Sequence, residues 1–325
     1  MSRLADVRRF AERHHRLIGA IQVVVGAVFI ASIGWAIRGS FHSAWDDLRN
    51  ANLALFGLAC VAIAAYYLVF VVGWIWILAD WGIRISYGQA LRAEMVSMLA
   101  KYIPGGVWTP AARVVAARRA GITDAALVTS SMLLEAGISA VAGVVVFVVS
   151  LGFVDGVDAP LAPLVVFGVV IAVLVQPRVF RPLASRLLRR FGYTRELPTL
   201  RERTITLLLA FYAGTWVLGG FGLWLLLRSV GAHPEPASIV FLGGVSAVGA
   251  IVAVLFIFAP SGLGPREASM YGLMLAISTE GQALGATALN RVAITLVELV
   301  LFVGGNLVLR AREREPRLVE AEQSG

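Results

Sequence analysis

The feature that most constrains this chain is a series of apolar runs, each about as long as a membrane is thick. A helix needs roughly 20 apolar residues to cross about 30 Å of hydrocarbon. Six runs meet that requirement: 17–37, 53–79, 124–150, 205–228, 238–258 and 286–309. Because backbone polar groups must be satisfied internally within hydrocarbon, such runs favour helices. We therefore expect an integral membrane protein built from helices.

Two shorter segments and one interrupted segment complete the expected fold. Residues 160–176 are uncharged but barely long enough for a span, whereas residues 266–278, roughly 20 Å long as a helix, are too short to cross alone. Residues 86–119 read as a helical hairpin. The sequence thus predicts an all-α protein, a polytopic transmembrane bundle with about 7–8 spans plus a re-entrant hairpin.

The basic residues are explained by orientation in the membrane. The formal charge is +8, yet only 15% of residues are charged, against about 25% in an ordinary globular domain. Arginines gather beside apolar runs, with five in 1–16, eight in 178–203 and four in 310–317. Positive residues stay on the cytoplasmic side, so we expect both termini there and no nucleic-acid partner. The segment 178–203 can also contact anionic headgroups, although orientation alone is the favoured interpretation.

This charge pattern divides the chain into three parts. We predict a basic cytoplasmic tail (1–16), a transmembrane domain (17–309) and a charged cytoplasmic tail (310–325), with the protein crossing the cytoplasmic membrane many times. Cys60 is the only cysteine, and the four histidines lie in tails or loops without a neighbouring carboxylate or Cys at ligand spacing. We therefore expect no metal site and no cofactor.

The first interruption lies within the predicted hairpin. Ser86 is suited to cap a helix that runs to about residue 102. Pro104 disfavours helical backbone in the residue before it, and Gly105 permits a sharp reversal. A second helix is expected over 108–119. Both ends of the pair then lie inside, so the tip is expected to enter the membrane.

The second interruption lies at residues 259–267, between a full span and the short segment. Pro265 suits the first turn of a helix, and Glu267 in that turn favours the positive end of the helix dipole. Irregular backbone at membrane depth is tolerated only where protein or a watered cavity satisfies it, and paired broken segments indicate binding sites in transporters. The alternative is that both interruptions are ordinary cytoplasmic loops.

Several ionisable residues fall inside the apolar segments, where they usually face a pathway or a partner. They are Glu94, Lys101, Arg113, Glu135, Arg266, Glu267, Arg291 and Glu298. Lys101 is the only lysine of the chain, and a lysine at a helix break indicates that a compact charge is required.

Two interpretations of these charges remain open. They can face a substrate, or they can pair internally, with Glu135 or Glu298 bound to Arg113 or Arg266. For Arg291, near the outer end of its span, we expect the side chain to reach towards the interface rather than to serve a function.

The two interruptions also carry a resemblance to a known family. The segment from Lys101 to Trp108, followed by Arg113, Gly121 and Glu135, resembles one signature of the lysylphosphatidylglycerol synthase transmembrane-region family, also called flippase-like domain proteins. The segment from Pro260 to Glu267 resembles its second signature, a Pro/Gly turn followed by Arg-Glu. The resemblance covers about residues 15–310.

The resemblance implies a membrane domain that moves, or helps to move, a phospholipid or a lipid-linked sugar between leaflets. The best-known members also carry a soluble aminoacyl-transfer domain, which we expect this chain to lack. Stand-alone relatives are associated with cell-envelope polysaccharide or glycolipid pathways, so enzymes of envelope biosynthesis are candidate partners. The oligomeric state stays open.

We expect an anionic headgroup to bind at the two interruptions, with Lys101, Arg113 and Arg266 neutralising phosphate. The full set of expected substrate-binding residues is Lys101, Tyr102, Pro104, Gly105, Trp108, Arg113, Glu135, Pro260, Gly262, Gly264, Arg266, Glu267 and Glu298. The alternative is a membrane subunit or enzyme of glycolipid or cell-envelope polysaccharide synthesis. Because the sequence has no nucleotide-binding pattern and no recognisable catalytic group, we assign no catalytic residue and expect no enzymatic activity.

Overall fold

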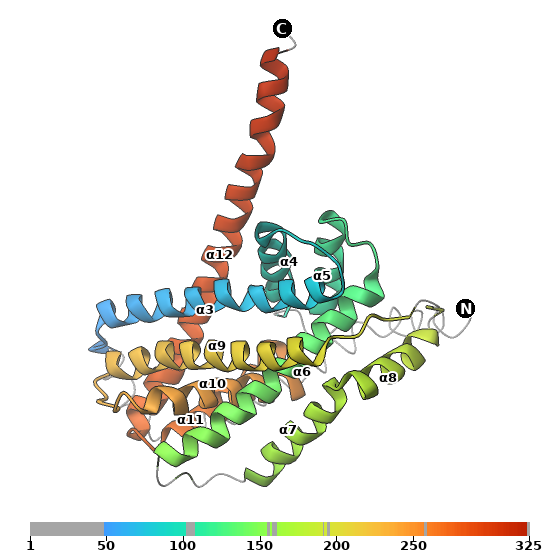
Figure 1. The fold of residues 1–325 in the computed structure, drawn as a ribbon. Coiled ribbons are helices and arrows are strands. Elements are labelled where there is room, and N and C mark those ends of the chain that lie inside the picture. The colour runs from blue at the N-terminus through green and yellow to red at the C-terminus, as the bar shows by residue number, and fades with distance from the viewer. Residues whose placement is uncertain are drawn as a thin grey trace, which may run out of the picture.

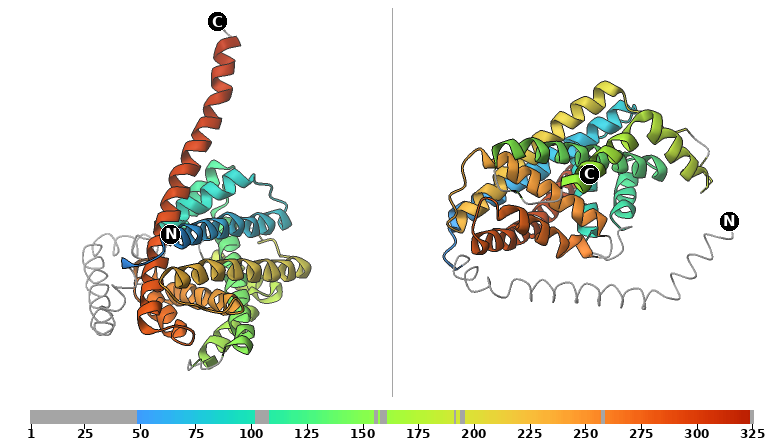
Figure 2. Two further views of the ribbon diagram at one scale, coloured as in Figure 1. Left: turned by 90° about the vertical axis from the view of Figure 1, so that its left-hand side faces the viewer. Right: turned by 90° about the horizontal axis from the view of Figure 1, so that it is seen from below.

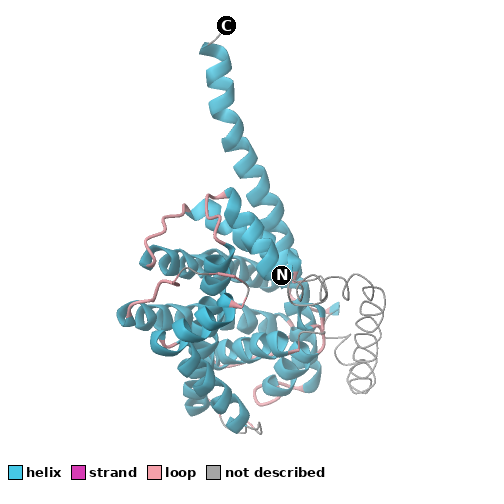
Figure 3. Cartoon of the chain, turned by 90° about the vertical axis from the view of Figure 1, so that its right-hand side faces the viewer, coloured by secondary structure: helices cyan, strands magenta, loops and turns pink. Residues whose placement is uncertain are grey.

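The computed structural model describes residues 49–323, apart from 102–107, 155–156, 158–160, 191, 194–195 and 257–258. Within these ranges the chain is helical and has no strand (Figure 3). The predicted tail 1–16 and the predicted first span 17–37 lie outside the described residues. The expectation of an all-α fold is therefore confirmed for the described part of the chain.

Five of the described helices are long and apolar enough to cross a membrane. They are α3 (Leu53–Asp80), α6 (Ala125–Ser150), α9 (Glu202–Ser229), α10 (Ser238–Leu255) and α12 (Glu280–Gln323), the last meeting the test up to Gly304. A sixth is counted if α7 (Leu161–Val175) and α8 (Pro177–Arg189), bent by 76°, form one span. The predicted total of spans and the sides of the termini stay predictions.

Helix α12 differs most from its predicted form. The sequence placed the end of the last span at residue 309 and a charged tail after it, whereas the helix continues without a break to Gln323. Figures 1 and 2 show α12 crossing α3 and α9 and then extending beyond the bundle towards the C-terminus. Much of the predicted tail is therefore a continuation of the last helix.

The centre of the bundle is formed by α3, α9, α10 and α6, which pack against one another in that order (Figure 1). Helices α9 and α10 approach closely because glycines face each other. A Cβ atom on Gly220 would lie 2.2 Å from the carbonyl oxygen of Ile239, and one on Gly243 would lie 2.7 Å from that of Trp216. Small residues at such contacts allow the backbones of membrane helices to pack tightly.

The predicted hairpin is present as α4 (Tyr87–Ala100) and α5 (Trp108–Arg119), which pack against each other. Ser86 caps α4 as expected, since its side chain accepts a hydrogen bond from the backbone N–H of Gln89 while that glutamine side chain returns to Ser86. The hairpin also contacts α3, α6 and α12. It is thus held against three helices of the bundle, although its depth in the membrane stays a prediction.

The second interruption separates α10 from α11 (Pro265–Met274), with a short 3-10 turn, η2 (Pro260–Gly262), between them. Positive φ angles at Ser261 (54°), Gly262 (65°) and Gly264 (95°) produce the reversal. Pro265 opens α11 as predicted, and the Glu267 carboxylate accepts the backbone N–H of Gly264 at 2.6 Å. The predicted short segment is therefore a helix of 10 residues.

Candidate functional site

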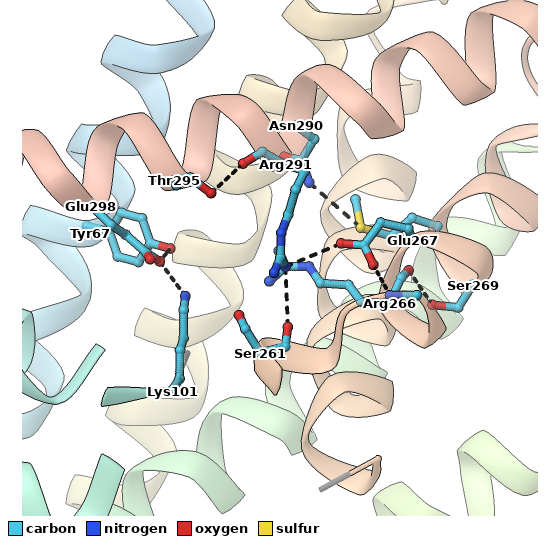
Figure 4. A network of polar contacts seen from close by, with 12 residues as sticks. Tyr67, Lys101, Ser261, Arg266, Glu267, Ser269, Asn290, Arg291, Thr295 and Glu298 are labelled. Carbon is cyan, nitrogen blue, oxygen red and sulfur yellow. Dashed lines mark hydrogen bonds and ion pairs between the residues drawn. The ribbon is translucent and has the colours of Figure 1, made fainter. Parts of the chain in front are cut away.

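The two interruptions meet in space although they are far apart in the sequence. The backbone N–H of Ser261 donates a hydrogen bond of 3.0 Å to the carbonyl oxygen of Lys101, the residue that ends α4. The carbonyl oxygen of Ser261 in turn accepts from Nη1 of Arg291 at 3.3 Å (Figure 4). Left-handed backbone is unfavourable for a residue with a Cβ, and such strain tends to persist at functional sites. Both backbone polar groups of Ser261, the N–H and the C=O, are used here.

Three cations from three elements lie around this contact. Lys101 ends α4, Arg266 is in the first turn of α11, and Arg291 is on α12. The positive charges of both arginines act on the lysine ammonium group, so the three groups belong to one electrostatic cluster. We call these three residues the cation cluster.

Two carboxylates hold two members of the cation cluster. Glu298, whose side chain is 1% exposed, pairs with Lys101 and also accepts a hydrogen bond from the hydroxyl of Tyr67 on α3. Glu267 pairs with Arg291 at 3.3 Å. Among the described residues, three cations thus face two carboxylates.

Arg266 is the member of the cation cluster best placed to bind a ligand. Among the described residues its half-buried side chain makes no hydrogen bond and no ion pair. Figure 4 shows the side chains of Arg266 and Arg291 pointing towards the same place beside Ser261. A guanidinium group presents several donors in a planar fork that matches phosphate oxygens.

The structure corrects the interpretation of Arg291. The sequence placed it near the outer end of a span, and we expected its side chain to reach the membrane interface. Instead it points inwards, is only 19% exposed, and contacts Ser261 and Glu267. That prediction is wrong because position along a span does not show which way a side chain leaves the helix. The seven-residue spacing from Glu298, which puts both on one face, was the available signal.

A second charged group lies deeper in the bundle and centres on Arg113 of α5. The guanidinium group pairs with Glu94 of α4 and, at 3.3 Å, with Glu135 of α6. It also donates to the hydroxyl of Ser97 at 3.0 Å and lies over the ring of Trp74, 4.7 Å from its centroid. All three charged side chains are at most 5% exposed.

Glu135 extends this group to a further helix. The hydroxyl of Tyr212 on α9 donates to its carboxylate at 3.1 Å. One arginine therefore joins both arms of the hairpin to α6, and through Tyr212 to α9. Of the pairings considered from the sequence, Glu135 with Arg113 is present, while Glu298 pairs with Lys101. The guanidinium of Arg113 is already surrounded, so we assign Arg113 to holding the hairpin rather than to a headgroup. Glu94 was absent from the expected site residues.

The remaining expected residues divide into three groups. Gly262 and Gly264, with the backbone of Pro260, form the turn that places Ser261 and Arg266. Trp108 opens α5 and is 48% exposed. Tyr102, Pro104 and Gly105 lie outside the described residues. Within the described ranges, no three His, Cys, Asp or Glu side chains are grouped as metal ligands.

Several long apolar helices, polar groups gathered at two helix interruptions and buried ion pairs between helices define an integral membrane protein that crosses the bilayer more than once. The family model described as "Lysylphosphatidylglycerol synthase TM region" matches residues 19–302, and the chain belongs to this family of flippase-like membrane domains. The expected membership is thus confirmed. The comparison with curated proteins gives no match.

Proposed function

We propose that this protein moves a phospholipid or a lipid-linked sugar between the two leaflets of the cytoplasmic membrane. The anionic headgroup binds at the cation cluster of Lys101, Arg266 and Arg291, while the acyl or prenyl tails stay in the bilayer. The observation that carries the proposal is that three cations from separate elements converge where two helix interruptions touch. The proposal assigns no covalent chemistry to the chain.

The charge balance supports an anionic ligand. Burying an excess positive charge in an apolar environment is unfavourable unless an opposite charge accompanies it. Within the described part of the chain the three cations of the cluster face two carboxylates, and a phosphate beside Arg266 would compensate its positive charge. A phosphate would also compete with Glu267 and Glu298 for their present partners. This competition provides a route by which binding loosens contacts between α11, α12 and the hairpin.

The Arg113 group has a different role in the proposal. It fixes α4 and α5 to α6, so that the end of α4 stays opposite η2 whether or not a headgroup is bound. One side of the site, the hairpin, therefore stays fixed. The other side, the segment from η2 to α12, can change its contacts when a headgroup binds. This arrangement resembles the general design in which broken helices line the binding site of a transporter.

The test is a leaflet-exchange assay with the full chain in proteoliposomes. Fluorescent phosphatidylglycerol and a fluorescent prenyl-phosphate-linked sugar are each followed by their accessibility to a membrane-impermeant quencher. Arg266→Gln is the informative variant, because Arg266 makes no hydrogen bond or ion pair within the described part of the chain and its loss should leave the fold intact. We expect exchange at least about tenfold slower, which corresponds to roughly 1.4 kcal/mol of lost headgroup binding in the transition state.

The matched control is Arg118→Gln, which removes an exposed arginine from the last turn of α5. Exchange by this variant should equal that of the unaltered protein. The proposal would be contradicted if the unaltered protein moved neither lipid. It would also be contradicted if Arg266→Gln and the unaltered protein moved lipid at equal rates and had equal thermal stability. Release of a chemically altered lipid would instead indicate the enzymatic alternative.

A further inference from the structure

Helix α8 combines an arginine-rich face with an apolar face. Arg178, Arg181, Ser185 and Arg189 recur at spacings of three and four residues, which puts them on one side of the helix. Phe180, Leu183 and Leu187 recur at the same spacings on the other side. No acidic residue occurs within the helix. A helix of this pattern is typical of the boundary between lipid headgroups and hydrocarbon.

Phe180 of α8 packs against the core, whereas the rest of the apolar face stays open. The helix turns by 76° away from α7, at one edge of the bundle (Figure 1). None of its residues is buried, and the large apolar side chains of Leu183 and Leu187 are 52% and 53% exposed. An apolar face this open to water would be unfavourable, whereas insertion into the acyl boundary of a membrane would stabilise it.

A pocket of about 540 Å³ lies on the arginine-rich side of α8. Its lining residues come from α8 and from the segment that leads to α9, and they are Pro177, Arg178, Arg181, Pro182, Ser185, Arg189, Glu196 and Thr199. This volume falls within the range of small-ligand sites. None of these residues belongs to the site at the two helix interruptions.

The arginines of the pocket are only partly neutralised by the described residues. Arg181 pairs with Glu196, which is the only acidic residue of the lining. Arg178 has Glu202 at 3.9 Å, but both side chains are more than 80% exposed, and such a surface pair contributes little. Among the described lining residues the pocket therefore keeps an excess of two positive charges, on a helix whose opposite face is apolar.

We propose that this pocket binds the phosphate of an anionic phospholipid, while Leu183 and Leu187 on the opposite face hold α8 at the boundary between headgroups and hydrocarbon. Guanidinium forks match phosphate oxygens, and each arginine near a membrane surface adds to the attraction for anionic lipid. The opposite apolar face favours a membrane lipid over a free phosphate ion, because insertion of Leu183 and Leu187 holds the pocket at the depth of the headgroups. Orientation of the chain explains the number of arginines here, but it does not explain a pocket formed by three of them.

The experiment measures lipid that stays with the purified full chain after reconstitution in nanodiscs of phosphatidylcholine containing a minor fraction of phosphatidylglycerol. Lipids retained after detergent exchange are quantified by mass spectrometry. The Arg178→Gln/Arg189→Gln variant should need about 25-fold more phosphatidylglycerol for equal retention, given the contribution of each arginine near a surface. Arg118→Gln/Arg119→Gln, which removes two exposed charges from α5, should retain lipid like the unaltered protein.

Three outcomes would overturn the proposal. The first is equal retention by the α8 variant and the unaltered protein, and the second is an equal loss in the α5 control. The third is displacement of the lipid by inorganic phosphate, which would show a site for the free ion. Thermal unfolding of each variant verifies that the fold is kept. A failure of this proposal can be distinguished from a failure of the function proposed above. The Arg266→Gln substitution should leave the difference in lipid retention between the α8 variant and the unaltered protein unchanged.

Discussion

The ammonium group of Lys101 pairs with the carboxylate of Glu298, which joins the end of α4 to the middle of the apolar part of α12. The side chain of Glu298 is 1% exposed and that of Lys101 is 24% exposed. The only lysine of the chain therefore forms an ion pair that links the hairpin to the last membrane helix. A bound anionic headgroup would compete with Glu298 for this lysine.

A double-mutant cycle with Lys101→Gln and Glu298→Gln tests this link. Each single variant leaves the other charge without this ion-pair partner, so the double variant should destabilise the protein by less than the sum of the two single variants. We expect a coupling free energy of roughly 0.5–3 kcal/mol, as for residues in direct contact. Unfolding in mixed micelles measures it, and additive effects of the two substitutions would contradict the contact.

Arg113 should be far more important for stability than another arginine of the same helix. Arg113→Ala leaves the buried carboxylates of Glu94 and Glu135 unpaired, and removing one partner of a buried pair costs about 3–5 kcal/mol. Arg118→Ala, at an exposed position of α5, should change stability by less than about 0.5 kcal/mol. Similar thermal midpoints for the two variants would show that the hairpin is not held by Arg113.

Gly262 should tolerate no side chain. Its φ is +65°, and an added Cβ would lie 2.2 Å from the Cβ of Ala253 on α10. Left-handed backbone costs a residue with a Cβ about 1–2 kcal/mol, and the overlap adds about 1–3 kcal/mol. Gly262→Ala should therefore lower the free energy of unfolding, measured in micelles.

Gly272→Ala is the control for that substitution. This glycine lies inside α11, and its Cβ would meet nothing within 4 Å. Alanine is a better helix residue than glycine by roughly 0.5–1 kcal/mol, so the control should be neutral or slightly stabilising. A Gly262→Ala protein as stable as the control would contradict the geometry of the turn.

Two adjacent glycines of α9 should respond differently to the same change. A Cβ on Gly220 would lie 2.2 Å from a carbonyl oxygen of α10, which cannot move without its helix, whereas the nearest atom to a Cβ on Gly219 is 3.7 Å away in a tyrosine ring. Gly220→Ala should separate the helices and lower the thermal midpoint, at a cost of about 1–3 kcal/mol. Gly219→Ala should be close to neutral, and equal effects would argue against close packing of α9 and α10.

The local signals of this sequence predicted much of the fold. Ser86, Pro265 and Glu267 act at helix starts as their types suggest, since capping and first-turn preferences depend on neighbours within one turn. The lengths of the apolar runs located the five described spans, because run length is also a local property of the sequence. The continuation of α12 beyond residue 309 was missed, because charge was interpreted as the end of a span, and a charged segment can also form helix.

The candidate site was predicted less completely, since side-chain partners depend on tertiary contacts. Lys101 and Arg266 were expected at one site, and the structure brings both into the cation cluster. The direction of Arg291 depends on the rotation of α12 against η2, which a single span does not reveal. The sequence did not show that Glu94 pairs with Arg113, because the distance between these two residues depends on how the two arms of the hairpin pack.

The central claim is that the two helix interruptions are neighbours and form one site. Disulfide formation between Lys101→Cys and Ser261→Cys, in a Cys60→Ser background, tests it most directly. The 3.0 Å backbone hydrogen bond between these residues places them within reach of a disulfide. Asn52→Cys/Ser229→Cys is a matched control, because the backbone N–H of Asn52 donates a 2.8 Å hydrogen bond to the carbonyl oxygen of Ser229. We predict that both pairs cross-link in native membranes under mild oxidation, whereas cross-linking of the control pair alone would contradict the account.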